Sequence, residues 1–395
     1  MLAVALLVGG CTSGVATSST RPTAGPASAP PYVAPTPFPS CADRVRALLS
    51  PEQLVGQLFL AGVDASRPES AAVAIRAGGL GGVFLAGRWH GGTAALAAST
   101  NLMQAAAVPA SGPFARLWIA ADQEGGLVQA LAGFGFSAIP TGAAQAAMAP
   151  EALRAAAAQW GGELGQAGVN LDLAPVLDVV SPADAGSNQA IGIPERELGH
   201  DPAAVSAHGS AVVKGMAAAG IGTAGKHFPG LGRVRGNTDT SSSGVSDPAM
   251  TADDPDLQPF REAIFAGTAF VMVSLATYPR LDSTQPAAFS ASVVDGVLRG
   301  RLSYSGTVIS DDLGNARAVA AVLAPQRAVR FLEAGGDVVL DVGGGGVGDM
   351  EAAVLNRASA DPAFAARVRT SASRVLAGKA RAGLLRCPPP GRQPA

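Results

Sequence analysis

Residues 221–232 read IGTAGKHFPGLG, an apolar run followed at once by a cation, an imidazole and a Pro-Gly pair. The run Ile221 to Gly225 predicts a short buried strand, and the Pro-Gly pair predicts a tight turn directly after it. Lys226 and His227 therefore fall where a strand ends and a loop begins. In parallel α/β proteins, ligands bind at this end of the strands.

The same theme recurs from residue 42 to residue 385: a short run rich in Val, Ile and Leu, a loop, and an Ala-rich helical pattern. Helices are predicted, for example, at Pro51 to Gln57, with Ser50 as N-cap, and at Pro150 to Ala167. Continuous apolar runs are typical of strands buried on both faces, and helices supply the crossovers that parallel strands need. The predicted strands are Leu58 to Ala61, Gly82 to Ala86, Leu117 to Ala121, Val169 to Ala174, Ile221 to Gly225, Phe270 to Ser274, Thr307 to Ser310 and Val338 to Val342. Eight such units in one uninterrupted domain predict an α/β fold, a single (β/α)8 TIM-like barrel.

Polar residues follow four of these runs. Asp122 comes after the third, Asp178 after the fourth, Lys226 and His227 after the fifth, and Asp311 after the seventh. The carboxyl ends of the strands in such a barrel form one rim, which carries the active site. We therefore expect these side chains to surround a common site.

The rim carboxylates suggest glycoside hydrolysis, in which one carboxylate attacks the anomeric carbon and a second group moves the proton. Asp311 ends the run TVIS and begins DDLGNA, so a strand end would aim its carboxylate rigidly. Asp311 and Asp312 could instead cap a helix, because Asp is favoured at helix N-termini. One of the two could also be catalytic while the other caps.

The chain resembles glycoside hydrolase family 3, and within it the bacterial β-N-acetylhexosaminidases. The matching motifs occur in the order typical of the family: ADQEGG at residues 121–126, NLDLAPVLDV at 170–179, RELGHDP at 196–202, KHFPGLG at 226–232 and VISDDL at 308–313. The resemblance implies a retaining mechanism in which Asp311 forms a covalent glycosyl intermediate. It also implies sugar contacts by four charged or polar residues, Asp122, Arg196, Lys226 and His227. Such side chains supply strong hydrogen bonds to sugar hydroxyls, although Arg196 or Lys226 could merely pair with a structural Asp.

The loop after KHFPGLG departs from the family pattern. The family has His where this chain has Leu231, and its loop continues to an Asp-Ser-His whose His donates the proton. An ungapped match puts Asp239 at the His position, and a shift by two residues puts Ser241 there. A carboxylic acid can shuttle a proton near neutral pH and a Ser hydroxyl cannot, so we predict Asp239 as the acid/base. The alternative is that Asp239 is a plain turn residue.

A second departure concerns the sugar. The family commonly reads GGRVQR after DQE, where this chain has Leu127 and Ala130. The loss of these cations weakens the case for the usual N-acetylglucosamine contacts. We predict cleavage of terminal β-linked N-acetylhexosamine from cell-envelope glycans or peptidoglycan fragments. The alternatives are a β-glycosidase of different sugar specificity, phosphorolysis in place of hydrolysis, and a non-catalytic sugar-binding envelope lipoprotein.

The N-terminus predicts export. Residues 1–11 are apolar, too short to span a bilayer, and end in Gly-Gly-Cys11. They resemble the end of a secretory signal peptide with a bacterial lipobox, in which Cys11 accepts a lipid, although no positive charge precedes them. The alternative is an N-terminus with an unmodified Cys. We expect an exported protein that is lipid-anchored to the outer face of the bacterial cell membrane.

The remaining domain boundaries follow from composition. Residues 12–40 are rich in Ser, Thr, Pro and Ala and predict a disordered tether, followed by the catalytic domain at 41–388 and a disordered tail at 389–395. Cys41 and Cys387 lie just before the first helical pattern and just after the last, which predicts a disulfide between the ends of the domain. Two unpaired thiols are the alternative.

Charge and histidine usage limit the partners. The 395 residues carry a net charge of −2, with 48% hydrophobic and 15% charged residues, so nothing favours nucleic acid. None of the four His residues lies at metal-ligand spacing from another, and we expect neither a metal nor another cofactor. The expected partners are a carbohydrate substrate and, through Cys11, the membrane; the protein itself is expected to be a monomer.

Overall fold

The computed structural model describes residues 40–68, 71, 75, 79–111 and 114–388. The predicted signal segment with Cys11, the tether up to residue 39 and the tail at 389–395 lie outside these residues. No helix in the described part of the chain is long and apolar enough to cross a membrane.

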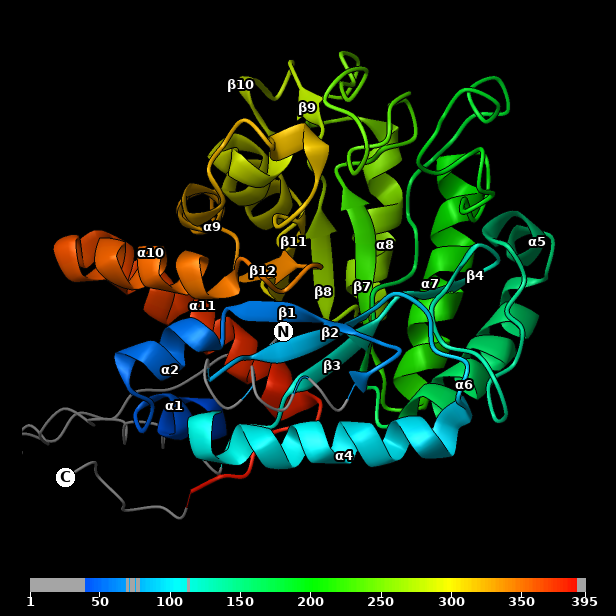
Figure 1. Ribbon diagram of the computed structural model, residues 1–395. Helices are drawn as coiled ribbons and strands as arrows, with labels where there is room; N and C mark the ends of the chain where they lie inside the picture. Colours follow the sequence, from blue (N-terminus) through cyan, green and yellow to red (C-terminus); the bar gives the residue numbers. More distant parts are fainter. Residues whose placement is uncertain (1–39, 69–70, 72–74, 76–78, 112–113, 389–395) are drawn as a thin grey trace, which may run out of the picture. The chain divides into compact units, whose positions relative to one another are not determined.

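Eight parallel strands close into a barrel in the order β1-β12-β11-β8-β7-β6-β3-β2 (Figure 1). Each predicted strand overlaps one of them, and the predicted (β/α)8 barrel is confirmed. The strands are β1 (Phe59–Asp64), β2 (Gly82–Ala86), β3 (Trp118–Ala121), β6 (Leu171–Asp172), β7 (Gly222–Phe228), β8 (Phe270–Val273), β11 (Thr307–Asp312) and β12 (Val338–Asp341).

Helices surround the strands (Figure 1). The α-helices are α1 (Cys41–Arg46), α2 (Pro51–Gly56), α4 (Gly92–Ser111), α5 (Gly142–Ala146), α6 (Pro150–Gln166), α7 (Pro202–Ala218), α8 (Gln258–Ala266), α9 (Ala324–Glu333), α10 (Val347–Ala360) and α11 (Pro362–Arg381). Short helical segments are η2 (Pro255–Leu257), η3 (Ala287–Phe289), the π-helical η4 (Ser292–Arg301) and η5 (Arg317–Val319). Ser50 caps α2 as predicted, because its hydroxyl accepts the backbone N–H of Gln53 at 3.2 Å.

Apolar side chains fill the barrel and the layer between strands and helices. All four residues of β3 and of β8 are buried, and Trp118 meets Phe270 edge to face with ring centroids 5.2 Å apart. This burial on both faces explains why the strands read as continuous apolar runs. Two small hairpins extend the barrel: β4 (Gln123–Gly125) with β5 (Val128–Gln129), and β9 (Thr277–Tyr278) with β10 (Asp282–Pro286).

Two strands are longer than predicted at the end where they reach the rim. β7 continues to Phe228 and β11 to Asp312, so Lys226, His227 and Asp311 are part of strands. Backbone hydrogen bonds extend β7: Lys226 donates to Pro175 at 3.0 Å and accepts from Leu177 at 2.6 Å. Lys226, His227 and Asp311 are therefore held by the barrel backbone itself.

The two ends of the domain are joined. Cys41, the first residue of α1, forms a disulfide with Cys387, which follows α11. Ala115, just before β3, bridges to Leu385. The disulfide therefore lies toward the amino-terminal ends of the strands, away from the rim that carries the predicted site.

Candidate active site

The carboxyl ends of the strands surround a cavity of about 340 Å³. All six residues predicted for substrate binding or catalysis line it: Asp122, Arg196, Lys226, His227, Asp239 and Asp311. They come from β7, β11 and the segments after β3, β6 and β7, so closure of the barrel brings together residues that are far apart in sequence.

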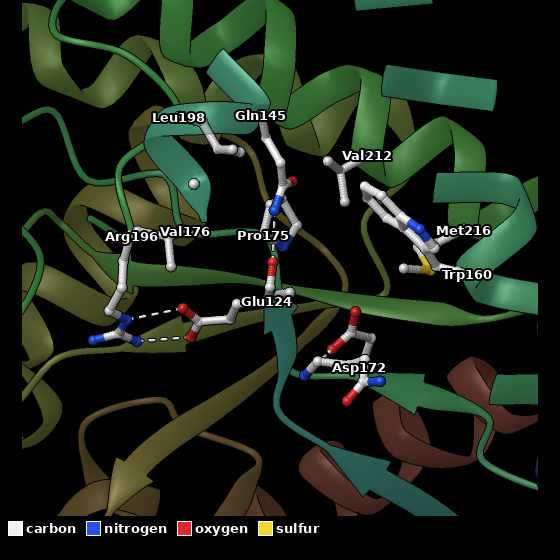
Figure 2. Close-up of a pocket in the computed structure, with 13 residues that line it drawn as sticks. Glu124, Gln145, Trp160, Asp172, Pro175, Val176, Arg196, Leu198, Val212 and Met216 are labelled. Atoms are coloured by element: carbon white, nitrogen blue, oxygen red, sulfur yellow. Dashed lines mark hydrogen bonds and ion pairs between the residues drawn. The ribbon is translucent and has the colours of Figure 1, made fainter. Parts of the chain in front are cut away.

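Lys226 is the centre of a buried charge network. Its Nζ lies 2.6 Å from both Asp122 Oδ1 and Glu124 Oε1. Glu124 also accepts two hydrogen bonds from Arg196, at 2.8 Å from Nε and 2.7 Å from Nη2 (Figure 2). Burial alone would raise the pKa of Glu124, but Arg196 and Lys226 outweigh it and hold that pKa well below its ordinary value.

Glu124 was not predicted as a site residue. It stands two residues after Asp122 in the motif ADQEGG, and alternate residues of an extended segment point to the same side. That spacing is the signal that could have identified it. Glu124 joins the two cations, so Arg196 and Lys226 are held in place by the same carboxylate.

A second carboxylate, Asp178, orients His227; the sequence predicted Asp178 at the rim but indicated no role for it. His227 is held through one ring nitrogen. Its Nδ1 lies 2.7 Å from Asp178 Oδ2, and the buried Asp178 also accepts the backbone N–H of Leu231 at 2.6 Å. With Nδ1 engaged by Asp178, Nε2 is the ring nitrogen available to a ligand in the cavity. Leu231 lines the same cavity as an apolar wall.

The adjacent residues Asp311 and Asp312 divide their tasks. Asp312 accepts backbone N–H groups of Gly314 at 2.9 Å and Val342 at 3.0 Å through Oδ1, and of Asn315 at 3.3 Å through Oδ2. Asp311 accepts the backbone N–H of Asp312 at 2.9 Å. Asp312 therefore holds the turn after β11, and the Asp311 carboxyl is the one available for chemistry.

The loop with Asp239 is attached to the loop after β11. The carbonyls of Thr238 and Asp239 accept N–H groups of Ala318 at 3.0 Å and Arg317 at 3.1 Å. Asp239 lines the cavity, whereas the Ser241 hydroxyl donates to the carbonyl of Ser243 at 2.9 Å and borders a different surface pocket. The ungapped match to the family motif puts Asp239 at the proton-donor position, and the shifted match puts Ser241 there. Of these two residues, Asp239 is the one that lines the cavity.

A family model described as the glycosyl hydrolase family 3 N terminal domain matches residues 51–376. The chain belongs to glycoside hydrolase family 3. The resemblance seen in the motifs is thereby confirmed, and with it the prediction of a glycosidase.

Relatives within family 3 are named for hexosaminidase activity. A β-N-acetylhexosaminidase structure from Beutenbergia cavernae is 48% identical, with a TM-score of 0.82 over 85% of this chain and 99% of that one. The β-hexosaminidase LpqI of Mycobacterium tuberculosis is 32% identical over 358 residues, 86% of each chain. A family 3 β-N-acetylglucosaminidase from Paenibacillus is 28% identical, with a TM-score of 0.75 over 88% of this chain and 66% of that one.

Asp239 and Asp311 influence each other's ionisation. Burial raises the pKa of both carboxyls; repulsion from Asp239 raises that of Asp311 further, while His227 opposes both shifts. Asp239 is exposed at the mouth of the cavity, yet surrounding protein atoms displace enough water to raise its pKa. Because two like charges repel, the pair retains one proton at pH values where isolated Asp side chains have lost theirs. A family 3 reaction needs one acid and one carboxylate.

A cluster of charges holds the base of the Asp239 loop. Arg233 lies 2.9 Å from Asp247, 2.7 Å from Asp254 and 2.7 Å from Asp256. Asp247 is buried and accepts further hydrogen bonds from the backbone N–H groups of Ala249 and Met250. Arg233 thus ties residues on both sides of the loop to one another.

A small cavity of about 20 Å³ is lined by Glu124 and Asp172 (Figure 2). Asp172 accepts the backbone N–H of Gln123 at 3.0 Å, and its Oδ2 has no hydrogen-bond partner among the described residues. Burial raises the pKa of Asp172 to about 7. At acidic pH this carboxyl is therefore neutral and adds no negative charge near Glu124.

Proposed function

We propose that the chain is a retaining exo-glycosidase that removes terminal β-linked N-acetylhexosamine, such as N-acetylglucosamine, from cell-envelope glycans or peptidoglycan fragments. The observation that carries this proposal is that Asp311 and Asp239 line one cavity together with the charged network of Asp122, Lys226 and Arg196. The names of the family 3 relatives support the choice of sugar.

In the first step, the Asp311 carboxylate attacks the anomeric carbon while protonated Asp239 donates its proton to the glycosidic oxygen. The bond to the leaving group breaks, the leaving alcohol departs neutral, and the sugar becomes an ester of Asp311. In the second step, the Asp239 carboxylate takes a proton from water, whose oxygen attacks the anomeric carbon. The ester bond breaks and Asp311 is released as a carboxylate.

The opposite wall of the cavity holds the rest of the sugar. In the closed barrel β3 lies four strands from β11, so Asp122, which follows β3, faces Asp311 across the barrel. Asp122, Lys226 and the Nε2 of His227 are the groups that we assign to sugar hydroxyls. Their charged partners keep them at fixed positions, which favours a single orientation of the ring.

Hydrolysis is favoured over phosphorolysis. The cations at the cavity are already paired: Lys226 with Asp122 and Glu124, and Arg196 with Glu124. Once Asp239 has lost its proton, a phosphate entering for the second step would also meet a negative charge. We expect the free sugar as product with and without added phosphate, and a sugar 1-phosphate would contradict hydrolysis.

The test of the activity is turnover of 4-nitrophenyl N-acetyl-β-glucosaminide, compared with the corresponding β-glucoside. Asp311→Asn is expected to lower kcat by about 10⁴-fold or more, because the nucleophile is lost. Ligand binding without release of nitrophenol would instead identify a non-catalytic sugar-binding protein. Faster hydrolysis of the β-glucoside would contradict the proposed sugar specificity.

We further propose that residues 41–388 form the catalytic domain of a monomer that is tethered through a lipid on Cys11 to the outer face of the cell membrane. The disulfide between Cys41 and Cys387 supports export, because disulfides persist in oxidising compartments. Cys11→Ser is expected to move the protein from the membrane fraction to the medium. Unchanged fractionation would contradict the anchor.

A further inference from the structure

A second cavity, of about 270 Å³, adjoins the catalytic cavity above β2 and the β4–β5 hairpin. The two cavities share three wall residues, Phe84, Asp122 and Val342. The second cavity contains neither Asp239 nor Asp311 in its lining. A group bound in it would therefore lie away from the reacting bond.

The barrel topology indicates which part of the sugar approaches it. β3 lies opposite β11 in the strand order, and β2 lies opposite β8. A pyranose ring carries C1 and C4 at opposite ends, with C6 on the carbon next to the ring oxygen. When C1 is at Asp311, the oxygens on C4 and C6 point toward Asp122. A substituent on either oxygen enters the second cavity.

The walls of this cavity are mostly apolar. Leu127 is 68% exposed and lies beside Val128, Ala130 and Leu85. The side-chain amide of Gln129 is already engaged by the protein. It donates to the carbonyls of Leu131 at 3.1 Å and Ser137 at 2.8 Å and accepts the N–H of Ile139 at 2.9 Å.

Arg88 supplies the hydrogen-bond donors. Its guanidinium donates to the carbonyls of Leu127 at 3.0 Å and Gln129 at 3.3 Å, which fixes it against the hairpin. An Arg side chain has five N–H donors, so these two bonds leave others for a ligand. The family motif has Arg at the positions of Leu127 and Ala130, and here a cation reaches the same hairpin from the segment after β2.

We propose that the second cavity is a subsite for an uncharged O-acyl group on the C4 or C6 oxygen of the terminal sugar. An ester carbonyl accepts a hydrogen bond from Arg88, and the acyl carbons pack against Leu127 and Val128. The mostly apolar walls suit acyl carbons better than the hydroxyls of a second sugar ring, and an anionic group would have to give up water against the same walls. This inference rests on the proposed function, which sets the orientation of the ring.

The kinetic test compares four chromogenic substrates: the 4-nitrophenyl N-acetyl-β-glucosaminide, its 4-O-acetyl and 6-O-acetyl derivatives, and the chitobioside. We expect kcat/KM for at least one acetylated substrate to lie within about threefold of the unsubstituted value or above it. A kcat/KM more than about 100-fold below the unsubstituted value for both acetylated substrates would overturn the proposed subsite. If the chitobioside released its disaccharide directly, at a rate similar to hydrolysis of the unsubstituted substrate, the assignment of the second cavity to an acyl group would be overturned.

A pair of variants separates the subsite from general effects on the fold. Leu127→Arg is expected to lower the ratio of kcat/KM for the acetylated over the unsubstituted substrate by about tenfold, because apolar contacts of this size discriminate to that degree. Leu102→Arg, at a residue of α4 that is 57% exposed, is the matched control and should leave the ratio unchanged. An equal loss on both substrates in Leu127→Arg would overturn the proposal.

Calorimetry separates this proposal from the proposed function. If the unsubstituted substrate is not hydrolysed, the proposed function fails, but the binding of O-acetylated and plain N-acetylglucosamine can still be compared. Tenfold weaker binding of both acetylated sugars would overturn the subsite even then. Equal or tighter binding of one of them, reduced selectively by Leu127→Arg, would support it.

Discussion

At the scale of single residues, the ungapped match to the family motif puts a carboxylic acid, Asp239, where that motif has a proton-donating His. Asp239 reaches the cavity that contains Asp311, and each carboxyl has a raised pKa. A carboxyl pair can therefore perform the acid and nucleophile roles that the family pattern divides between a His and an Asp. These roles can be tested by measuring how activity depends on the leaving group of the substrate and on pH.

Asp239→Asn is expected to lower kcat/KM by about 10²–10⁴-fold on substrates with poor leaving groups, because general acid catalysis is lost. The loss should be small on the 2,4-dinitrophenyl glycoside, whose leaving group needs no proton. Ser241→Ala is the control, since this hydroxyl is bonded to Ser243 and lies outside the cavity lining. A larger loss in Ser241→Ala than in Asp239→Asn would favour the other alignment.

The pH profile of the 2,4-dinitrophenyl reaction reports on Asp311. The proposed mechanism needs ionised Asp311, and burial raises the pKa of this carboxyl, so the acidic limb should lie above the pH at which an ordinary Asp ionises. In the active form Asp239 is protonated and does not repel Asp311, so Asp239→Asn should leave this limb in place. A limb that moves to lower pH would show that Asp239 ionises before Asp311, which contradicts its role as the acid.

At the scale of elements, the loop after β7 needs an anchor, because Asp239 comes well after Phe228, the last residue of that strand. The Arg233 cluster provides one, together with the backbone hydrogen bonds from Arg317 and Ala318. Positioning of the proposed proton donor therefore depends on a cation that does not line the catalytic cavity.

Arg233→Met is expected to lower the free energy of unfolding by about 3 kcal/mol, because the buried Asp247 loses its charged partner. It should also lower kcat more than it raises KM, since the Asp239 loop loosens while the Lys226 network stays intact. Arg154→Met, which removes an exposed ion pair with Glu151, is the control and should cost less than about 1 kcal/mol. Thermal unfolding and steady-state kinetics would measure both effects. Equal losses in kcat with both variants would contradict the anchor role.

At the scale of the whole molecule, one disulfide closes a loop between residues 346 apart in sequence. Replacing Cys41 and Cys387 together by Ser is expected to lower the free energy of unfolding by about 2–4 kcal/mol, because the unfolded chain regains conformational freedom. The disulfide lies at the opposite end of the barrel from the cavity, so kcat at temperatures where both proteins are folded should not change. Denaturant titration would measure the first effect, and a loss of kcat in the folded variant would contradict this separation of stability from activity.

Much of the whole fold was predictable from sequence, because each barrel strand is buried on both faces and so appears as a continuous apolar run. The limits of the strands were less predictable. The run Val169 to Ala174 contributes only Leu171 and Asp172 to a strand, and β7 continues through the polar Lys226 and His227. Apolar composition identifies which residues are buried, whereas backbone hydrogen bonds to neighbouring segments decide where a strand ends.

The site was predictable in its members and less so in their partners. Glu124 pairs with Arg196 across 72 residues, and Asp178 orients His227 across 49. Such pairs follow from no local spacing, because closure of the barrel brings the two residues together. Glu124 and Asp178 were therefore not predicted as partners, although they stand in the motifs ADQEGG and NLDLAPVLDV.

The amino-acid sequence by itself determined the barrel, the family and the rim at which the polar residues gather, because periodicity and motif order are local properties of a chain. Only the tertiary structure decided that Asp239 and not Ser241 borders the cavity, that Asp312 holds a turn while Asp311 is available, and that a second cavity adjoins Asp122. These facts depend on how loops from distant strands pack against one another, and that packing exists only once the barrel has closed.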